Sequence, residues 1–371
     1  MRNKKMTQKI YRTIFSQYPS SELVEAYNCL ENKFKKSKDN KVYCIINNVD
    51  CDNEKKQKNL AIASHSIQRK RLKKISHKNE VFTLTKDYNN PYKKKLYKSN
   101  IKSTLTFPGF CSYHDNTIFK SIENENNYIY DKEKIFLISY RTLAKEYCKL
   151  KDDVHFFSWN LDNWTCNERI ELIRERIKCN VDEYKIINHY TATNIQKIKL
   201  IFFCIRHYYQ LFVVEKKDMK SAFKYNQEIY KYVDNLLKEF THCVVNGKRI
   251  EMEYRIYKSS KTIAFSHAYE LKRKKNNYIF FLTILPTESG SDIIISCLKQ
   301  DFDILTSVEE IREIINGNEN YINRILNMYK DEIAHNIDDY DLDYADKFFL
   351  EWDIPAMQNF PIEYVKIISE N

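Results

Sequence analysis

Apolar and polar residues alternate along the chain between Cys243 and Cys297. A period of two residues sends successive side chains to opposite faces of an extended chain, which is typical of a β-strand. We interpret four segments as antiparallel strands: 250–257, 262–268, 278–285 and 292–298. Helices near 307–315 and 319–334 are expected to follow this sheet.

Apolar residues recur at helical spacing between residue 115 and residue 240. The chain contains only 4 Gly and 6 Pro, which favours long helices with few tight turns. The most apolar run, 198–214, includes Lys199, Arg206 and His207, so we expect a helix within the fold and not a membrane span. The predicted helices are 115–123, 131–152, 167–179, 192–214 and 218–239.

The first 110 residues show two other patterns of apolar and polar positions. Residues 1–36 carry apolar positions at helical spacing and predict a helical lead-in. From 41 to 110, short apolar runs at 42–46, 80–84 and 104–107 alternate with loops rich in Lys and Asn, which predicts a small module of strands and loops. Its core is thin, so a bound metal would add the stability that burial alone does not provide.

These patterns together predict an α+β fold in four parts. Residues 1–40 are the lead-in, and residues 41–125 form the basic module. Residues 126–240 form a helical region, and residues 241–371 form the antiparallel sheet with its C-terminal helices.

Charge is distributed unevenly along the 371 residues. The whole chain carries +11, but residues 1–103 contain 25 Lys and Arg against 9 Asp and Glu, a net of +16, so the remainder sums to −5. A cationic end joined to a mildly acidic body is expected of a module that faces nucleic acid. A solvated Lys-rich surface explains the charge alone equally well.

Cysteine and histidine suggest a metal site in the basic module. The ten Cys occur in a chain without an apolar leader, which indicates a reducing, cytoplasmic setting where thiols serve as metal ligands or small core residues. Cys44-x6-Cys51 and Cys111-x2-His114 form two close pairs, and Zn²⁺ is held by four such ligands. The second pair stands where a helix should begin, in the manner of a treble-clef finger. The alternative is that these thiols are ordinary core and loop residues.

The order of parts resembles the HNH (ββα-metal) nuclease family. A Cys pair is followed by Ala63-Ser64-His65-Ser66-Ile67, and then by a Cys/His pair that opens a helix. The resemblance implies that His65 is the general base, and that Asp115 or Asn116 helps to hold a catalytic Mg²⁺ or Mn²⁺. Ser64 departs from the family, which usually has an acidic residue or a second His there. The site is therefore either catalytic or a purely structural finger.

Basic residues cluster on both sides of this candidate site. One cluster directly follows His65, and the other interleaves lysines with tyrosines. Such residues contact phosphates and stack on bases, although a solvated face explains each cluster singly. The predicted nucleic-acid contacts are Arg69, Lys70, Arg71, Lys73, Lys74, Lys93, Lys94 and Lys95.

Three segments also resemble an uncharacterised bacterial family with an HNH-like zinc module. They are His65 to Gln68, Phe110 to Glu123, and Tyr140 to Glu146. We expect Tyr140, Arg141 and Glu146 to form a buried polar network that braces the module. Bacterial proteins of this kind are often associated with phage defence, an argument by analogy.

The sequence thus favours a zinc-stabilised protein that binds DNA or RNA and is a candidate HNH-like nuclease. The competing interpretation is a sensor or interaction protein, in which zinc is only structural and the C-terminal region binds a protein partner. No P-loop, Gly-rich dinucleotide motif, Gly-x-Ser-x-Gly elbow or His-Glu-x-x-His motif occurs, so the classes that depend on them lose their usual signals.

Overall fold

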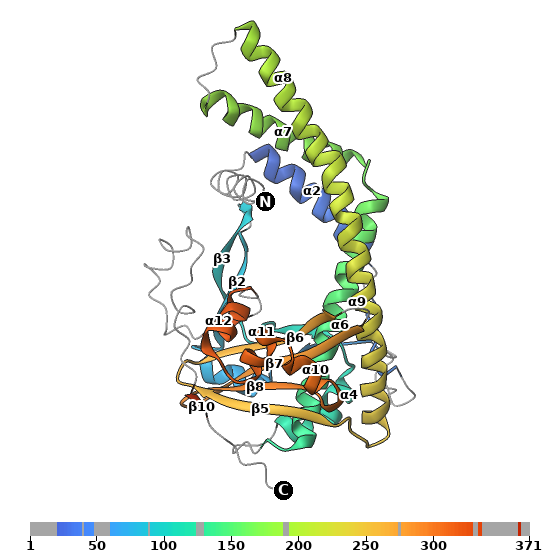
Figure 1. Ribbon diagram of the computed structural model, residues 1–371, viewed down its shortest axis with the longest axis vertical. Coiled ribbons are helices and arrows are strands. Elements are labelled where there is room, and N and C mark those ends of the chain that lie inside the picture. The colour runs from blue at the N-terminus through green and yellow to red at the C-terminus, as the bar shows by residue number, and fades with distance from the viewer. Residues whose placement is uncertain are drawn as a thin grey trace. The chain divides into compact units, whose positions relative to one another are not determined.

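The computed structural model describes residues 21–38, 41–47, 60–87, 90–123, 130–187, 193–273, 276–328, 333–335 and 363–364. The fold is α+β, as predicted (Figure 1). The chain divides into two units, which combine parts of the four predicted segments. We call Met1–Asn40, Lys86–Lys94 and Lys151–Glu228 the helical unit, and Lys41–Thr85, Lys95–Leu150 and Ile229–Asn371 the sheet unit.

The sheet unit contains the four predicted C-terminal strands, paired antiparallel (Figure 1). In the register of β7 and β8, Phe280 is opposite Cys297 and Phe281 is opposite Ser296. The strands are β5 (Met252–Ser259), β6 (Ile263–Arg273), β7 (Asn276–Thr287) and β8 (Gly290–Leu298).

Among the described residues, strands from elsewhere in the chain extend this sheet to eight members. The spatial order is β10-β5-β8-β7-β6-β9-β2-β3. The short strand β9 joins the parts, since Ala334 is aligned with Thr83 of β2 on one side and with Ala264 of β6 on the other. The added strands are β2 (Glu80–Asp87), β3 (Asn90–Asn100), β9 (Ala334–His335) and β10 (Glu363–Tyr364).

Helices cover both faces of the central strands. Phe281 belongs to a core shared with α6 (Lys132–Asp162) and α9 (Glu215–Val245). Its neighbour Phe280 points to the other face, into a core shared with three short helices. These are α10 (Phe302–Thr306), α11 (Glu309–Ile315) and α12 (Glu319–Met328), preceded by the 3-10 turn η3 (Lys299–Asp301).

Hydroxyl groups fix α6 against the sheet. The Thr142 hydroxyl lies 2.9 Å from that of Ser266 and 3.2 Å from that of Thr283, and the Ser139 hydroxyl lies 2.8 Å from that of Ser296. All five side chains are buried. Because buried hydroxyls need partners, these contacts specify where α6 lies along the strands.

The helical unit packs α2 (Ser21–Ser37) against α7 (Asn167–Ile187) through Leu23, Ala26, Leu30 and Leu172. Next come α8 (Asn194–Tyr209) and a π-helical turn, η2 (Gln210–Val214). The predicted helix over 192–214 is therefore confirmed from residue 194. In the described part of the chain, no helix has the length and apolar character to cross a membrane.

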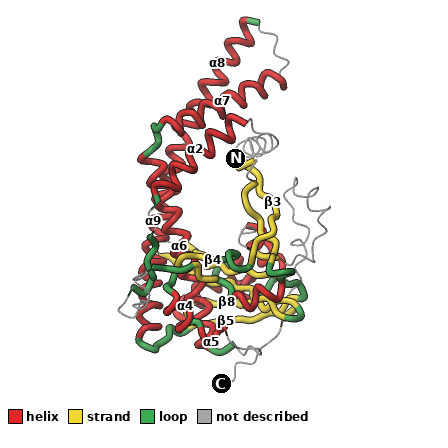
Figure 2. Tube along the Cα trace, turned by 180° about the vertical axis from the view of Figure 1, so that it is seen from behind, coloured by secondary structure: helices red, strands yellow, loops and turns green. Residues whose placement is uncertain are grey.

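The sheet unit also contains a two-stranded sheet and two short helices that follow it (Figure 2), and their buried apolar residues belong to the same core as those of α6 and α9. Strand β1 (Ala63–His65) pairs antiparallel with β4 (Thr106–Pro108), and α4 (Ser112–Ile118) and α5 (Lys120–Glu123) follow. We call loop 41–47, β1, β4 and α4 the triad unit. Between β1 and β4 the chain also forms α3 (Arg69–Leu72) and the turn η1 (Lys73–Ile75).

Candidate metal centre

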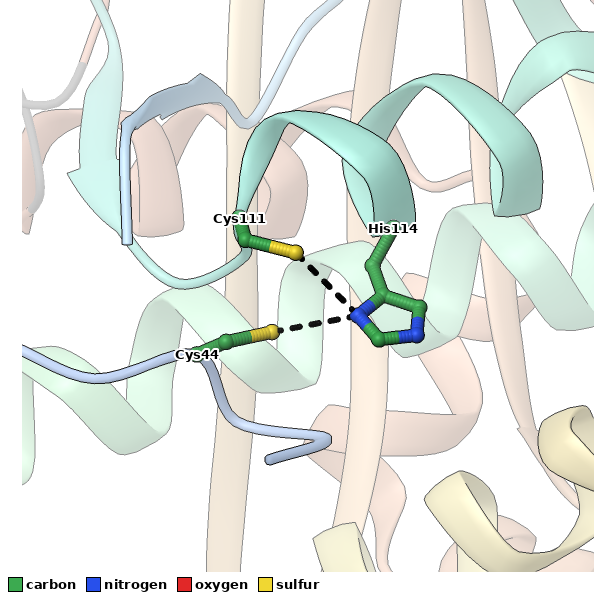
Figure 3. Close-up of side chains that lie close together, drawn as sticks. All are labelled: Cys44, Cys111 and His114. Carbon is green, nitrogen blue, oxygen red and sulfur yellow. Dashed lines mark hydrogen bonds between the residues drawn. The ribbon is translucent and has the colours of Figure 1, made fainter. Parts of the chain in front are cut away.

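Three predicted metal ligands converge in the triad unit. Cys44, Cys111 and His114 are buried, and their ligand atoms all lie within 4.8 Å of one another. Figure 3 shows both sulfur atoms directed at the same nitrogen of the imidazole. His114 Nδ1 lies 3.5 Å from Cys44 Sγ and 3.3 Å from Cys111 Sγ. The group could therefore hold a metal ion.

Backbone hydrogen bonds place Cys44 opposite the helix. The Ile45 amide donates to the Gly109 carbonyl at 2.8 Å, and the Ala61 amide donates to the Val42 carbonyl at 2.8 Å. Asn47 then turns the chain with a φ of 43°, in the left-handed region that Asn tolerates better than most residues. Loop 41–47 is thus fixed on both sides of Cys44, although the run 42–46 was expected to be a strand.

The other two ligands come from the start of α4. Cys111 is its N-cap residue, in an extended conformation with φ −74° and ψ 166°. His114 follows within the first turn, where residues three apart face the same side of a helix. The predicted strand-to-helix junction is confirmed, because β4 ends at Pro108 and α4 begins at Ser112.

The surroundings of Cys44 favour a thiolate. Burial raises the pKa of its thiol, but the hydrogen bond with His114 and those from the amides of Cys111, Asn47 and Ile46 outweigh burial and lower the pKa to about 6. Amide donors around sulfur are the outer-shell contacts that stabilise metal-bound thiolates. The Cys44 site is therefore suited to a ligand that binds a cation.

The two sulfur-to-nitrogen distances also fit a tetrahedral ion. A metal that binds sulfur at about 2.3 Å and nitrogen at about 2.1 Å holds the two ligand atoms about 3.6 Å apart. The separations of 3.5 and 3.3 Å lie close to this value. The predicted fourth ligand, Cys51, lies outside the described residues.

His65 ends β1 and has a defined tautomer. Its Nε2 lies 2.7 Å from the Ile101 carbonyl oxygen, which only accepts, so Nε2 carries the hydrogen and Nδ1 keeps a lone pair. Burial lowers the pKa of this imidazole and outweighs the hydrogen bond to Ile101, which raises it; nearby Arg141 lowers it further, and Asp115 raises it. A neutral imidazole at pH 7 can accept a proton.

Asp115 forms an ion pair with a buried arginine. Arg141 Nη2 lies 3.4 Å from Asp115 Oδ1 and 2.7 Å from Glu123 Oε1, and the guanidinium stacks 4.0 Å from the Phe119 ring. Asn116 is exposed, and its amide donates to the Ser112 hydroxyl at 3.4 Å. The structure thus gives Asp115 a partner, and Glu123 a role, that were not predicted. The sequence feature that could have pointed to Glu123 is its position at the end of the segment 110–123, which carries the family resemblance.

The predicted basic residues differ in their exposure to solvent. Arg69, Lys70 and Lys73 are exposed on α3 and η1. Arg71 is buried and donates to the Pro286 carbonyl at 3.2 Å, so it packs α3 against β7. Lys74 pairs with Glu288 at 2.9 Å. Lys93, Lys94 and Lys95 lie on β3, and their side chains are outside the described part of the structure.

The polar residues of the segment 140–146 on α6 contact three different parts of the structure. The Tyr140 hydroxyl lies 3.0 Å from that of Thr241 in α9, whereas Arg141 faces Asp115 and Glu123. Glu146 Oε2 lies 3.4 Å from His267 Nδ1 of β6. All three side chains are buried as expected, but Arg141 alone of them contacts the carboxylates of α4 and α5.

Comparison with known proteins gives no relative from which a role can be transferred. No protein-family model, curated protein or solved structure matches this chain. Interpretation of the site therefore depends on its own chemistry.

Proposed function

We propose that the chain is a nucleic-acid-binding protein whose triad unit is held together by Zn²⁺ in an HNH-like, treble-clef arrangement. The observation that supports this most is the buried group of two thiols and an imidazole at tetrahedral spacing. Soft thiolates with an imidazole favour zinc over hard cations such as Mg²⁺. The order of a paired strand, a second paired strand and a ligand-bearing helix agrees with the ββα arrangement.

The exposed cations of α3 and η1 supply the contact surface in this proposal. Arg69, Lys70 and Lys73 follow β1 directly and lie on the same segment of chain as His65. Cations near phosphates release condensed counterions, which makes affinity depend steeply on salt. Arg71 and Lys74 hold this segment against β7 and the turn that follows it, so they orient the surface without forming it.

The test compares two triple variants that remove equal charge. Arg69→Ala/Lys70→Ala/Lys73→Ala removes the proposed contacts, whereas Lys217→Ala/Lys220→Ala/Lys224→Ala removes three exposed cations of α9. Binding of labelled duplex DNA, single-stranded DNA and RNA is measured across a salt series. The first variant should reduce the slope of log affinity against log salt by about 2 to 3, and the second should leave it unchanged. Equal slopes in both variants would contradict the proposal.

A second candidate function is metal-dependent phosphodiester hydrolysis, and the state of His65 favours it. With Nε2–H donated to Ile101, the Nδ1 lone pair can take the proton of an attacking water. Asp115 and Asn116 would hold a divalent ion, which would stabilise the charge that develops on the phosphate. Asp115 shares only Oδ1 with Arg141, at 3.4 Å, so its other oxygen remains for this role.

Hydrolysis is tested with Mg²⁺ or Mn²⁺ on the same three nucleic acids. His65→Gln retains a side-chain amide that can donate to Ile101 but removes the base, so cleavage should fall by about 10² to 10⁴. His77→Ala replaces an exposed histidine of the same region and should cut normally. Equal cleavage by His65→Gln and the unmodified chain would remove His65 as the base; absence of cleavage by the unmodified chain would leave binding as the function.

A further inference from the structure

Helix α8 carries a regular row of exposed apolar side chains. Ile195, Ile198, Phe202, Ile205 and Tyr209 are spaced by three, four, three and four residues, and their exposed fractions lie between 54% and 68%. This is the spacing of the core positions of a coiled coil, in which two helices meet along one apolar seam. We call these five residues the α8 seam.

The packing of α8 within the helical unit uses a different side of the helix. His207 of α8 is buried, as is Leu211 of the following turn η2, and α7 and α8 lie side by side (Figure 1). Burial is the main cause that lowers the pKa of His207, followed by the charges of Arg206 and of Arg176 on α7. The α8 seam is therefore additional to the contact that holds α8 in the fold.

The exposed area is large enough for a stable dimer. A side chain of this size presents about 200 Å² when fully exposed, so the seam offers on the order of 600 Å². The flanking residues Ile201 and Tyr208 are 58% and 51% exposed, which brings the total to about 800 Å². A standard interface buries about 800 Å² on each partner, whereas scattered single apolar residues do not approach this area.

We propose that the α8 seam pairs two copies of this chain in parallel. In heptad terms, Ile195, Phe202 and Tyr209 stand at position a of the seam, and Ile198 and Ile205 stand at position d. In a parallel pair, position e of one helix faces position g of the other, so Arg206 at e would lie beside Ile201 at g of the second copy and pack its aliphatic stem there. In an antiparallel pair, Lys199 would face Arg206. Residues 194–214 contain no Asp or Glu to offset that repulsion, so the parallel arrangement is favoured.

The weak charge of α8 favours a second copy over a membrane as the partner. Any amphipathic helix shows this spacing, but one that lies on a membrane usually has a strongly charged polar face, whereas the Lys and Arg residues of α8 are Lys197, Lys199 and Arg206. Two identical seams satisfy each other about a two-fold axis and close the assembly at two copies. This inference is independent of the proposed nucleic-acid binding.

The molar mass in solution tests the proposal. Light scattering behind size exclusion should give the mass of two chains at micromolar concentration, and Ile198→Glu/Ile205→Glu should give the mass of one. Lys197→Glu, on the same helix but outside the seam, should remain dimeric. Circular dichroism should show equal helix content in all three proteins. An unmodified chain that is monomeric throughout, or a double variant that stays dimeric, would overturn the proposal.

Cross-linking tests the parallel direction. In a parallel pair, Ile198 and Ile205 each lie next to the same residue of the second copy. Ile198→Cys and Ile205→Cys should therefore each form a disulfide dimer under mild oxidation, above the background of the unmodified chain. Lys197→Cys should not. A dimer that cross-links at neither seam position would overturn the arrangement, as would a monomer that instead sediments with phosphatidylserine vesicles.

Discussion

Arg141 of α6 donates a hydrogen bond of 2.7 Å from Nη2 to Oε1 of Glu123, the last residue of α5. The same nitrogen reaches Asp115 of α4, so one buried guanidinium ties α4 and α5 to α6. The triad unit is therefore held by charge as well as by its proposed ion.

Replacing this arginine should destabilise the protein. Arg141→Met keeps an apolar contact with Phe119 but leaves two carboxylates without their cation, at a cost of about 3 kcal/mol in the free energy of unfolding. Urea denaturation measures the change. Arg174→Met, which breaks an exposed pair with Glu171, should cost less than about 0.5 kcal/mol. Similar losses in the two variants would mean that burial of Arg141 adds nothing.

Loss of a triad thiol should release the metal. Elemental analysis of the purified chain should find zinc, and Cys111→Ser should lower its content and reduce the melting temperature by more than about 5 °C, because metal binding contributes directly to folding. Cys29→Ser, at an exposed thiol, should keep the ion. Full zinc in Cys111→Ser would refute the triad as its site. Cys51→Ser then tests the predicted fourth ligand.

The pH dependence of cleavage should reflect the burial of His65. Its pKa is lowered from 6.5, so the neutral imidazole persists to lower pH than a free histidine allows. The acidic limb of kcat/KM should therefore have its midpoint below pH 6.5. The same depression contributes stability that is present above pH 6.5 and is lost as pH falls through the folded pKa. A midpoint above 6.5 would assign the limb to another group.

Glu146 should limit stability at neutral pH. Burial raises the pKa of its carboxyl, partly opposed by His267, so deprotonation is less favourable in the folded chain than in the unfolded chain. Stability from this group is full below pH 4.5 and declines as pH rises through the folded pKa. Glu146→Gln, which can still accept from His267, should gain about 1 kcal/mol at pH 7 and less at pH 4.5. A loss at pH 7 would show that the charged pair with His267 is stabilising.

Periodicity located the strands of the central sheet, but the polar positions of these strands do not mark a face exposed to solvent. Polar positions such as Thr283 and Ser296 alternate with apolar residues, yet both are buried. They face the hydroxyls of α6 and not solvent, so the alternation reports a polar helix-to-sheet contact. Sequence periodicity cannot distinguish these two surroundings.

The strand over 90–100 was not predicted because its composition resembles a loop. Pro91 and a run of lysines argue against a central strand, but β3 is the last member of the sheet order. Edge strands tolerate Pro and often carry Lys, which discourages pairing with other chains. The pairing of β2 with β9 was also beyond reach, since nothing in local spacing relates residue 83 to residue 334.

Spacing predicted the triad because Cys-x2-His places both ligands on one turn of α4. The same reasoning grouped Arg71 with its exposed neighbours, although it is buried against the Pro286 carbonyl. Charge in a sequence does not reveal which side of a four-residue helix faces the core. The bracing role of Arg141 was predicted, but its partners depend on how α4, α5 and α6 pack.

Strand β9 has a consequence for synthesis of the chain. It lies about 250 residues after β2, yet it is the strand that connects β2 to β6. At about 5 to 20 residues per second, a ribosome needs about 12 to 50 seconds to add that length. Strand β2 waits with an unpaired edge through this interval, and β6, which ends at Arg273, waits through about the last 60 residues of it. Nascent chains halted before residue 334 should therefore be the forms most in need of chaperones.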